Sequence, residues 1–311
     1  MRENKFPRVT IGIPTFNRAS TFLKQSLGSA LAQDYPNLEI IVSDNQSEDE
    51  TESYLRGIVD SRLRYLRQEK AVEPHENADT CLQEATGDYF LLLHDDDLID
   101  EDFVSVCVGS MEGREVGLVH TGARQIDQDG KILVSRTNPH GESSDFEFFV
   151  AVLEGWAVTF FCNTLYHTER LRSLGGFRSK SHAYQDVLAN LRMVRRYERV
   201  EIEEPKASYR IHDSKLGSSF SIESWCRDSL AMIDLMSELM PEKEDYFRTE
   251  GKRIMCRKNY GKNLRRFGFF RQLHAHWTVY RKFGFTYSPF EFFAELALRR
   301  VLPPRMNRVR A

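Results

Sequence analysis

Three consecutive aspartates, Asp95 to Asp97, directly follow an apolar run at residues 89–94. The run shows no polar alternation, which is typical of a buried central strand in an α/β sheet. Carboxylates crowded at the end of such a strand repel one another, and burying them costs free energy. Because carboxylate oxygens suit Mg²⁺ and Mn²⁺, we predict a metal site there that holds a phosphorylated ligand. The alternative is a solvated acidic turn that caps a helix at residues 100–111.

The spacing of apolar runs predicts the rest of the architecture. Strands expected at residues 8–13, 38–43 and 63–66 alternate with helices, which indicates βαβ units and a parallel sheet. After residue 111 the pattern favours a mixed, partly antiparallel second half. The strands expected there are at residues 116–120, 123–126, 131–134, 158–166 and 207–211, and mainly helices follow, at 222–239, 242–266, 270–282 and 289–300.

Charge is distributed unevenly along the 311 residues. The whole chain has a net charge of -3, but residues 251–311 hold 15 lysines and arginines against two acidic residues. This asymmetry predicts two functional parts, a domain at residues 1–220 and a basic helical region at 221–311.

The remaining composition predicts a cytoplasmic protein. Five widely spaced cysteines form no CxxC pair, which fits a reducing compartment better than a disulfide framework or a zinc site. The first residues lack the apolar core of a signal peptide, and no stretch reaches the ~18 apolar residues that span a bilayer.

Three strand ends are expected to meet at one edge of the sheet. They carry residues 14–18, Asp44 with Asn45, and the aspartate triplet. A carboxylate such as Asp44 can accept a hydrogen bond from the N3–H group of uracil or thymine. The triplet and its metal would then face a diphosphate.

These segments, with others in a fixed order, resemble a known family. The further matches are Asn77, residues 85–89, residues 174–177, Gln185 with Asp186, and residues 209–212. In this order and spacing, residues 7 to 220 resemble glycosyltransferase family 2, which has the GT-A nucleotide-diphospho-sugar fold. The resemblance implies an α/β fold with a mixed, mostly parallel sheet flanked by helices, followed here by a helical C-terminal extension.

The resemblance assigns nucleotide contacts to the first strand ends. It implies that Pro14, Thr15, Asn17 and Arg18 surround the nucleotide and that Asp44 binds the base. The pocket would also include Asn77 and Arg67. For Asn17 and Arg18 the alternative is a loop and helix cap, for Asp44 a cap on the helix expected at residues 47–60, and for Asn77 and Arg67 a solvated surface.

The triplet stands where the family has its DxD signature. The resemblance implies that the first carboxylate lies near the ribose and the last binds Mn²⁺ or Mg²⁺. The common form, Asp-x-Asp-Asp, would place His94 at the first aspartate, so Asp95, Asp96 and Asp97 are assigned together, with Asp97 the best single ligand. His212 would complete the metal site; its alternative is a surface histidine beside Asp213.

The resemblance also places a catalytic base and an acceptor side. Asp186 matches the base, although Gln185 stands where the family usually has glutamate. On the acceptor side it places Gly175, Gly176 and Phe177, whose alternative is a plain helix C-cap. Trp156 is a candidate for stacking on a sugar, or else a buried core residue.

The implied activity is that of a metal-dependent, inverting glycosyltransferase. The expected donor is UDP- or dTDP-linked, and the expected acceptor is a hydroxyl of a glycan or lipid-linked glycan in surface polysaccharide assembly. A sugar nucleotidyltransferase is the enzymatic alternative, but residues 14–18 lack the glycine-rich basic loop it needs. A non-catalytic sugar-nucleotide binder is the other.

The C-terminal helices combine aromatic and basic residues. The aromatic groups lie at residues 267–270, 283–287 and 290–293 and interleave with arginine and lysine. This pattern suits peripheral contact with the inner face of the membrane, or a helical cap with a solvated basic face; we expect no nucleic-acid partner. The sequence gives no prediction of oligomeric state.

Overall fold

The chain forms two compact units. The computed structural model describes residues 6–138, 143–212, 220–264 and 269–301. One unit contains residues 1–178 and 185–218, and the other contains residues 179–184 and 219–311. Whether they correspond to two functional domains, as the charge asymmetry suggests, stays a prediction.

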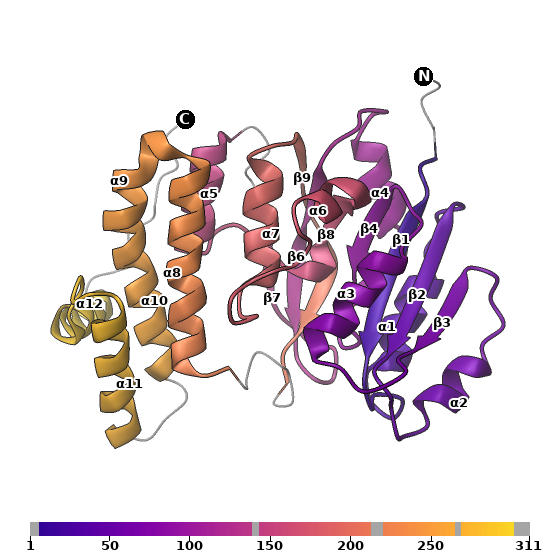
Figure 1. Cartoon of the computed structure of the whole chain (residues 1–311), viewed down its shortest axis with the longest axis horizontal. Helices are drawn as coiled ribbons and strands as arrows, with labels where there is room; N and C mark the ends of the chain where they lie inside the picture. The colour runs from indigo at the N-terminus through magenta and orange to yellow at the C-terminus, as the bar shows by residue number, and fades with distance from the viewer. Residues whose placement is uncertain (1–5, 139–142, 213–219, 265–268, 302–311) are drawn as a thin grey trace. The chain divides into compact units, whose positions relative to one another are not determined.

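The first unit is built on a mixed sheet flanked by helices (Figure 1). Its parallel half has the order β3-β2-β1-β4, and the second half continues with β8-β6-β9-β5. Strand β8 runs antiparallel to both neighbours, β9 runs parallel to β6, and the short β5 runs antiparallel to β9. The predicted fold class is therefore confirmed. The strands are β1 (Val9–Thr15), β2 (Leu38–Asp44), β3 (Leu63–Arg67), β4 (Tyr89–Leu92), β5 (Leu98–Ile99), β6 (Leu118–Ile126), β7 (Ile132–Arg136), which pairs with β6, β8 (Thr164–His167) and β9 (Arg199–Arg210).

Helices cover both faces of this sheet. Ile11 and Ile13 of β1 share one apolar cluster with Leu27 of α1 and Phe103 of α4. The opposite face packs against α3, which contacts β1, β2 and β4. The helices of this unit are α1 (Leu23–Leu31), α2 (Thr51–Arg56), α3 (Pro74–Glu84), α4 (Phe103–Ser110), α5 (Asp145–Glu154), α6 (Thr168–Ser173) and α7 (Gln185–Val194), with a 3₁₀ turn, η1 (Phe161–Asn163).

Strand β1 and helix α3 approach each other closely at Gly12. A Cβ atom on Gly12 would lie 2.6 Å from the Cβ of Cys81 in α3 and 2.9 Å from the ring of Phe90 in β4. Cys81 and Phe90 are fully buried, so neither has free space to move into. Glycine permits this approach, and α3 consequently carries Asn77, one turn earlier, to the ends of β1 and β2.

Two predicted boundaries around β6 were wrong. The segments 116–120 and 123–126 are parts of one strand, because Gly122, which resembles a turn signal, lies inside it. A Cβ on Gly122 would lie 2.6 Å from the carbonyl oxygen of Arg136, so the glycine marks a close backbone approach. Its partner β9 begins at Arg199, eight residues before the predicted start, because its charged residues conceal the strand pattern.

The strand predicted at residues 158–166 was also wrong in part. Asn163 turns the chain there by donating from its side-chain amide to the carbonyl of Val158 at 3.0 Å. The segment therefore bends through η1 before the short strand β8 begins at Thr164.

The second unit is helical, as predicted. Its helices are α8 (Ile222–Leu239), α9 (Glu244–Tyr246), α10 (Lys252–Leu264), α11 (Phe269–Lys282) and α12 (Pro289–Val301), with a 3₁₀ turn η3 (Pro241–Lys243) and a π-helical turn η4 (Phe247–Gly251). None of these described helices combines the length and apolar character needed to cross a bilayer. Phe267 and Asp213, which the sequence analysis singled out, lie outside the described residues.

One carboxylate organises the segment 179–184 within this unit. Asp228 of α8 is fully buried and accepts hydrogen bonds from the Ser179 hydroxyl at 2.9 Å and from the N–H groups of Ser181 and Ala183, each at 2.8 Å. These donors satisfy a charge that would otherwise be costly to bury.

We predict that Gly12→Ala destabilises the protein. The added methyl group overpacks the contact with α3 and should lower the free energy of unfolding by about 1–3 kcal/mol. Gly28→Ala in α1 is the matched control, since a Cβ atom on Gly28 would have nothing within 4 Å of it and helix propensity favours alanine. Urea unfolding measures both, and equal stabilities for the two variants would contradict the close approach.

Candidate active site

The acidic triplet occupies the turn between β4 and β5. The N–H group of Asp97 donates to the carbonyl of His94 at 3.1 Å, and the Ser26 hydroxyl of α1 donates to the same carbonyl at 2.9 Å. Beyond the turn, Leu98 and Ile99 pair with β9. The sheet thus fixes both ends of the turn at the carboxyl end of β4.

The three carboxylates have different partners. Asp95 accepts from the Thr15 hydroxyl at 2.7 Å, while Asp97, which is 1 % exposed, accepts from the N–H group of Arg210 at 2.9 Å. Asp96 lies 2.8 Å from Nε2 of His212. His212 is itself buried, so its alternative interpretation as a surface histidine is wrong.

Arg210 is a central residue to which the sequence analysis gave no role. Its Nε donates to the carbonyl of Asp96 at 2.8 Å, and its other nitrogens donate to Gln25 and to the carbonyl of Gln128. Its guanidinium also lies 4.8 Å from the ring centroid of Phe22. Arg210 therefore joins β9, α1 and the acidic turn.

Burial shifts the pKa values of His94, Asp95 and Asp97. Burial and the neighbouring Asp96 raise the pKa of Asp95 to about 7, against the opposing effects of Thr15 and Arg18. The same two causes raise the pKa of Asp97 well above its ordinary value, and burial lowers the pKa of His94. The surroundings thus disfavour the charged form of each group, and for the carboxylates a bound cation would compensate this cost.

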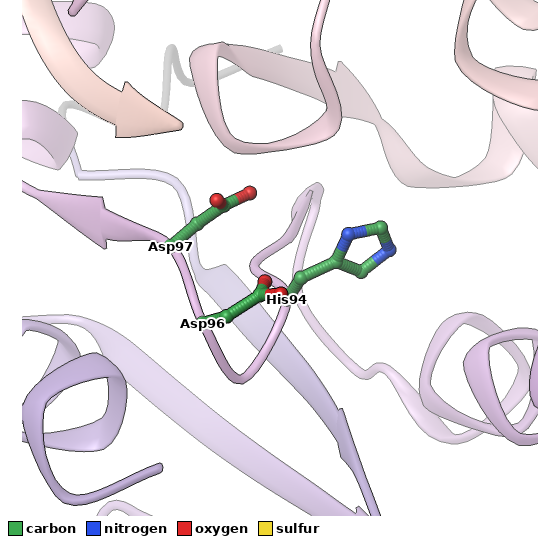
Figure 2. A group of neighbouring side chains, drawn as sticks. All are labelled: His94, Asp96 and Asp97. Atoms are coloured by element: carbon green, nitrogen blue, oxygen red, sulfur yellow. The ribbon is translucent and has the colours of Figure 1, made fainter. Parts of the chain in front are cut away.

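Three of these residues form a group that fits a metal ion. One potential ligand atom from each of His94, Asp96 and Asp97 lies within 4.8 Å of the others (Figure 2). Two carboxylates and an imidazole suit Mn²⁺, and carboxylates also suit Mg²⁺. Asp97 is the ligand favoured by the sequence, whereas His94 was noted only as an alignment position. Of the other two predicted ligands, His212 contacts Asp96 of this group, and Asp95 accepts instead from Thr15.

The first strand end is held to the second by its loop. Asn17 adopts a left-handed conformation (φ 54°), its N–H group donates to Ser47, and its side-chain oxygen accepts from Glu48, each at 2.8 Å. Pro14 and Thr15 end β1, and the Arg18 guanidinium lies 6.0 Å from the ring of Phe22. Asn17 therefore has the loop contacts of its alternative interpretation, while Thr15 in the same segment contacts Asp95 of the acidic turn.

Asp44 is fully buried at the end of β2. Its carboxylate accepts from the Tyr65 hydroxyl at 2.7 Å and from Arg67 and the N–H group of Ser47 at 2.8 Å. Burial, and after it the hydrogen bond to Asp44, raises the pKa of Tyr65 to about 12. A base bound by Asp44 would have to join or replace one of these donors. Asn77 is also buried, where its amide bridges the ends of β1 and β2.

Asp186 stands in the first turn of α7, within electrostatic reach of a tyrosine that the triplet also influences. Burial, then Asp97, Asp96 and Asp186, raise the pKa of Tyr209. Tyr209 stacks on Phe160 with ring centroids 4.6 Å apart. The charges of Asp96, Asp97 and Asp186 therefore all influence Tyr209, to which sequence reasoning gave no role.

The predicted acceptor-side residues occupy varied places. Gly175 and Gly176 have positive φ angles of 89° and 64° and make the hydrogen bonds of a helix C-cap after α6. Phe177 is a core residue, 2 % exposed, and its carbonyl accepts from the Gln185 amide at 2.7 Å. Trp156 is 54 % exposed, so the buried alternative is wrong for it.

Comparisons with known proteins match this chain to a family and to solved structures. Residues 10–172, just over half of the chain, match the family model described as Glycosyl transferase family 2. A 172-residue stretch is 29% identical to the GalNAc(5)-diNAcBac-PP-undecaprenol beta-1,3-glucosyltransferase of Campylobacter jejuni. That match covers 53% of this chain and 54% of the relative, so it spans about half of the relative's length.

Solved structures show the same fold. TarS 1-349 of S. aureus, solved in complex with UDP-GlcNAc, gives a TM-score of 0.58 at 12% identity and covers 96% of this chain and 93% of that one. The mannosyltransferase PcManGT of Pyrobaculum calidifontis, in complex with GDP-Man and Mn2+, gives 0.54 at 19% identity, with coverages of 96% and 81%. Similarity at these identities confirms the GT-A fold and carries no statement about ligands.

We predict that Mn²⁺ stabilises the protein through the acidic turn. Added Mn²⁺ should raise the melting temperature of the wild type, because binding to the folded state alone shifts the unfolding equilibrium. Asp97→Asn should lose this increase, and Asp34→Asn, an exposed aspartate in the same unit, should retain it. Thermal scans with and without EDTA measure the effect; an unchanged Mn²⁺ response in Asp97→Asn would reject the site.

Proposed function

The chain belongs to glycosyltransferase family 2, and from this premise we propose that it transfers a sugar from a nucleotide-diphospho-sugar to an acceptor hydroxyl in a metal-dependent reaction. The observation that carries the proposal is the group formed by His94, Asp96 and Asp97, which suits a cation. A separate carboxylate, Asp186, stands in the first turn of α7, and the charges of Asp186, Asp96 and Asp97 all influence Tyr209. Asp96 and Asp97 would hold the cation that stabilises the leaving diphosphate, and Asp186 would accept the proton of the acceptor hydroxyl.

The leaving-group side is the acidic turn. His94, Asp96 and Asp97 would hold the divalent ion, which when bound acts as a Lewis acid toward the departing nucleoside diphosphate. Thr15 and Arg18 would keep Asp95 oriented beside it, toward the ribose. The buried surroundings strengthen these electrostatic interactions because they exclude water.

Asp186 is proposed as the general base. It would take the proton from the acceptor hydroxyl as the oxygen bonds to the anomeric carbon and the bond to the diphosphate breaks. Inversion is proposed because the site supplies one base and the family pattern includes no enzymatic nucleophile. Gln185 anchors the start of α7 to the carbonyl of Phe177, so it can hold the base in place without the family's usual glutamate.

The substrates are also proposals. Asp44, Asn77 and Arg67 would line the nucleotide pocket, and we expect a UDP- or dTDP-linked donor; of the structural neighbours, one binds UDP-GlcNAc and one GDP-Man. The C. jejuni relative is named for an undecaprenol-linked acceptor, which supports a lipid-linked glycan acceptor here, in surface glycan assembly. Gly175, Gly176 and Trp156 would lie on the acceptor side. For such an acceptor, the protein would act on the cytoplasmic face of the membrane and contact it peripherally through residues 221–311.

The decisive experiment is a panel of nucleotide-sugars incubated with the protein and Mn²⁺. We expect release of nucleoside diphosphate from UDP- or dTDP-sugars, lost on chelation and in Asp97→Asn. Binding of a nucleotide-sugar without release or transfer, in any combination with candidate acceptors, would favour the non-catalytic binder that the change to Gln185 suggests.

We predict that Asp186→Asn separates binding from turnover. Loss of the base should reduce the transfer rate at least ~10²-fold, because the acceptor hydroxyl is a poor nucleophile until its proton is removed. Donor affinity, measured by calorimetry, should stay unchanged, and Asp34→Asn should keep full activity. Unaltered turnover in Asp186→Asn would remove this residue from the role.

A further inference from the structure

Helix α12 has an unusual polarity for the surface of a protein. Its exposed side chains are apolar: Phe290 is 85 % exposed, Leu298 is 58 % and Phe293 is 43 %, and Ala294 and Ala297 are exposed between them. The charged exposed residue within 290–298 is Glu291, whose carboxylate accepts from the N–H group of Ser288 at 2.7 Å as part of the helix cap. Water would therefore meet a largely hydrophobic surface along this helix.

The opposite side of α12 packs against its own unit and carries the second acidic residue of the helix, Glu295. Phe292 is buried against Tyr260 of α10, with ring centroids 5.3 Å apart. Glu295 pairs with Arg253 of α10 at 3.3 Å. A helix that faces water would turn charged residues such as Glu295 outward and apolar residues such as Phe290 and Leu298 inward, so the outward face of α12 suits an apolar partner.

Helix α11 also exposes apolar side chains. Leu273 and Trp277 are 52 % and 54 % exposed, and Phe285, just after the helix, is 55 % exposed with its ring 6.2 Å from that of Trp277. Phe293 lies 5.3 Å from His276 of α11, which joins the two helices (Figure 1). We call the set formed by Leu273, Trp277, Phe285, Phe290, Phe293 and Leu298 the apolar face.

The charge of this region restricts what can cover the apolar face. Residues 251–311 hold 15 basic and two acidic residues, and both acids, Glu291 and Glu295, have partners of their own. Arg281 and Lys282 are exposed beside Phe285. A second copy of the chain would bring like charges together. A nucleic acid offers bases on which aromatic rings can stack, but no hydrocarbon region for aliphatic side chains such as Leu273 and Leu298. An anionic bilayer offers both a hydrocarbon region and phosphate groups.

We propose that the apolar face inserts into the headgroup region of an anionic membrane, with the exposed Arg281 and Lys282 binding lipid phosphates. This deepens the peripheral membrane contact of the proposed function and rests on it for the biological role, but its test is independent of sugar transfer. Trp277 and Phe285 would lie at the headgroup level, where amphipathic and aromatic side chains concentrate. Phe290 would reach deepest, since it is the most exposed side chain of the apolar face, at 85 %.

The test compares two leucines with similar exposure. Leu298→Asp changes the apolar face, and Leu133→Asp, at a residue that is 51 % exposed on β7 of the other unit, is the matched control. Flotation with phosphatidylcholine vesicles containing about 30 mol % phosphatidylglycerol measures binding. We expect the wild type to float with these vesicles and not with pure phosphatidylcholine, and Leu298→Asp to bind at least ~10-fold more weakly. Leu133→Asp should behave as the wild type.

A second measurement reports insertion directly. Vesicles should shift the tryptophan emission of the wild type to shorter wavelength, and Trp277→Phe should abolish that shift although Trp156 and Trp225 remain. Circular dichroism confirms that each variant keeps its helices. Nucleoside diphosphate release without vesicles should be equal in Leu298→Asp and wild type; if release is absent throughout while vesicle binding is intact, the proposed function fails and this inference stands.

Three outcomes would overturn the inference. The wild type could fail to bind anionic vesicles, or Leu298→Asp and Leu133→Asp could bind them equally well. Alternatively, Leu298→Asp could dissociate a dimer seen by light scattering, or abolish binding to a homopolymeric RNA, without any vesicle binding by the wild type. Such a result would assign the apolar face to a second copy or to nucleic acid.

Discussion

The electrostatic cost of burying carboxylates between β4 and β5 is the constraint on which the rest of the site depends. Burial and mutual repulsion raise the pKa values of Asp95 and Asp97, so the fold must supply donors or a cation to hold their charge. Thr15 and Arg210 donate hydrogen bonds to these carboxylates, and His94 completes a group suited to a metal ion. The divalent cation proposed here would offset this cost and would also carry the negative charge of a bound nucleotide-diphospho-sugar.

The sheet order makes this arrangement possible. Strand β9 comes more than a hundred residues after the triplet, yet it pairs with β5 and delivers Arg210 and His212 to the same turn. Tyr209, on the same strand, brings the electrostatic influence of Asp186 and the triplet together. Metal binding, donor recognition and proton removal are thus proposed to share one scaffold, whose close packing at Gly12 sets the position of α3 and Asn77.

The helical unit follows a different physical rule. There, the carboxylates of Asp228 and Glu295 have partners within the unit, and apolar side chains remain outside on α11 and α12. This distribution, combined with an excess of basic residues, favours a lipid surface over water. A glycosyltransferase with a lipid-linked acceptor would gain from being held at the membrane where that acceptor is found.

The sequence by itself determined the parallel strands, the helical C-terminal part and the acidic edge, because uninterrupted apolar runs and strand-end carboxylates have strong local signals. It misjudged β6 and β9, since Gly122 resembles a turn and charged residues conceal a strand whose pairing is long-range. The roles of His94, Arg210 and Tyr209, the enclosure of Asp44 by Tyr65 and Arg67, and the outward apolar face of α12 were decided by tertiary structure. Each depends on which distant segments meet, and that is set by packing and burial over the whole fold rather than by neighbours along the chain.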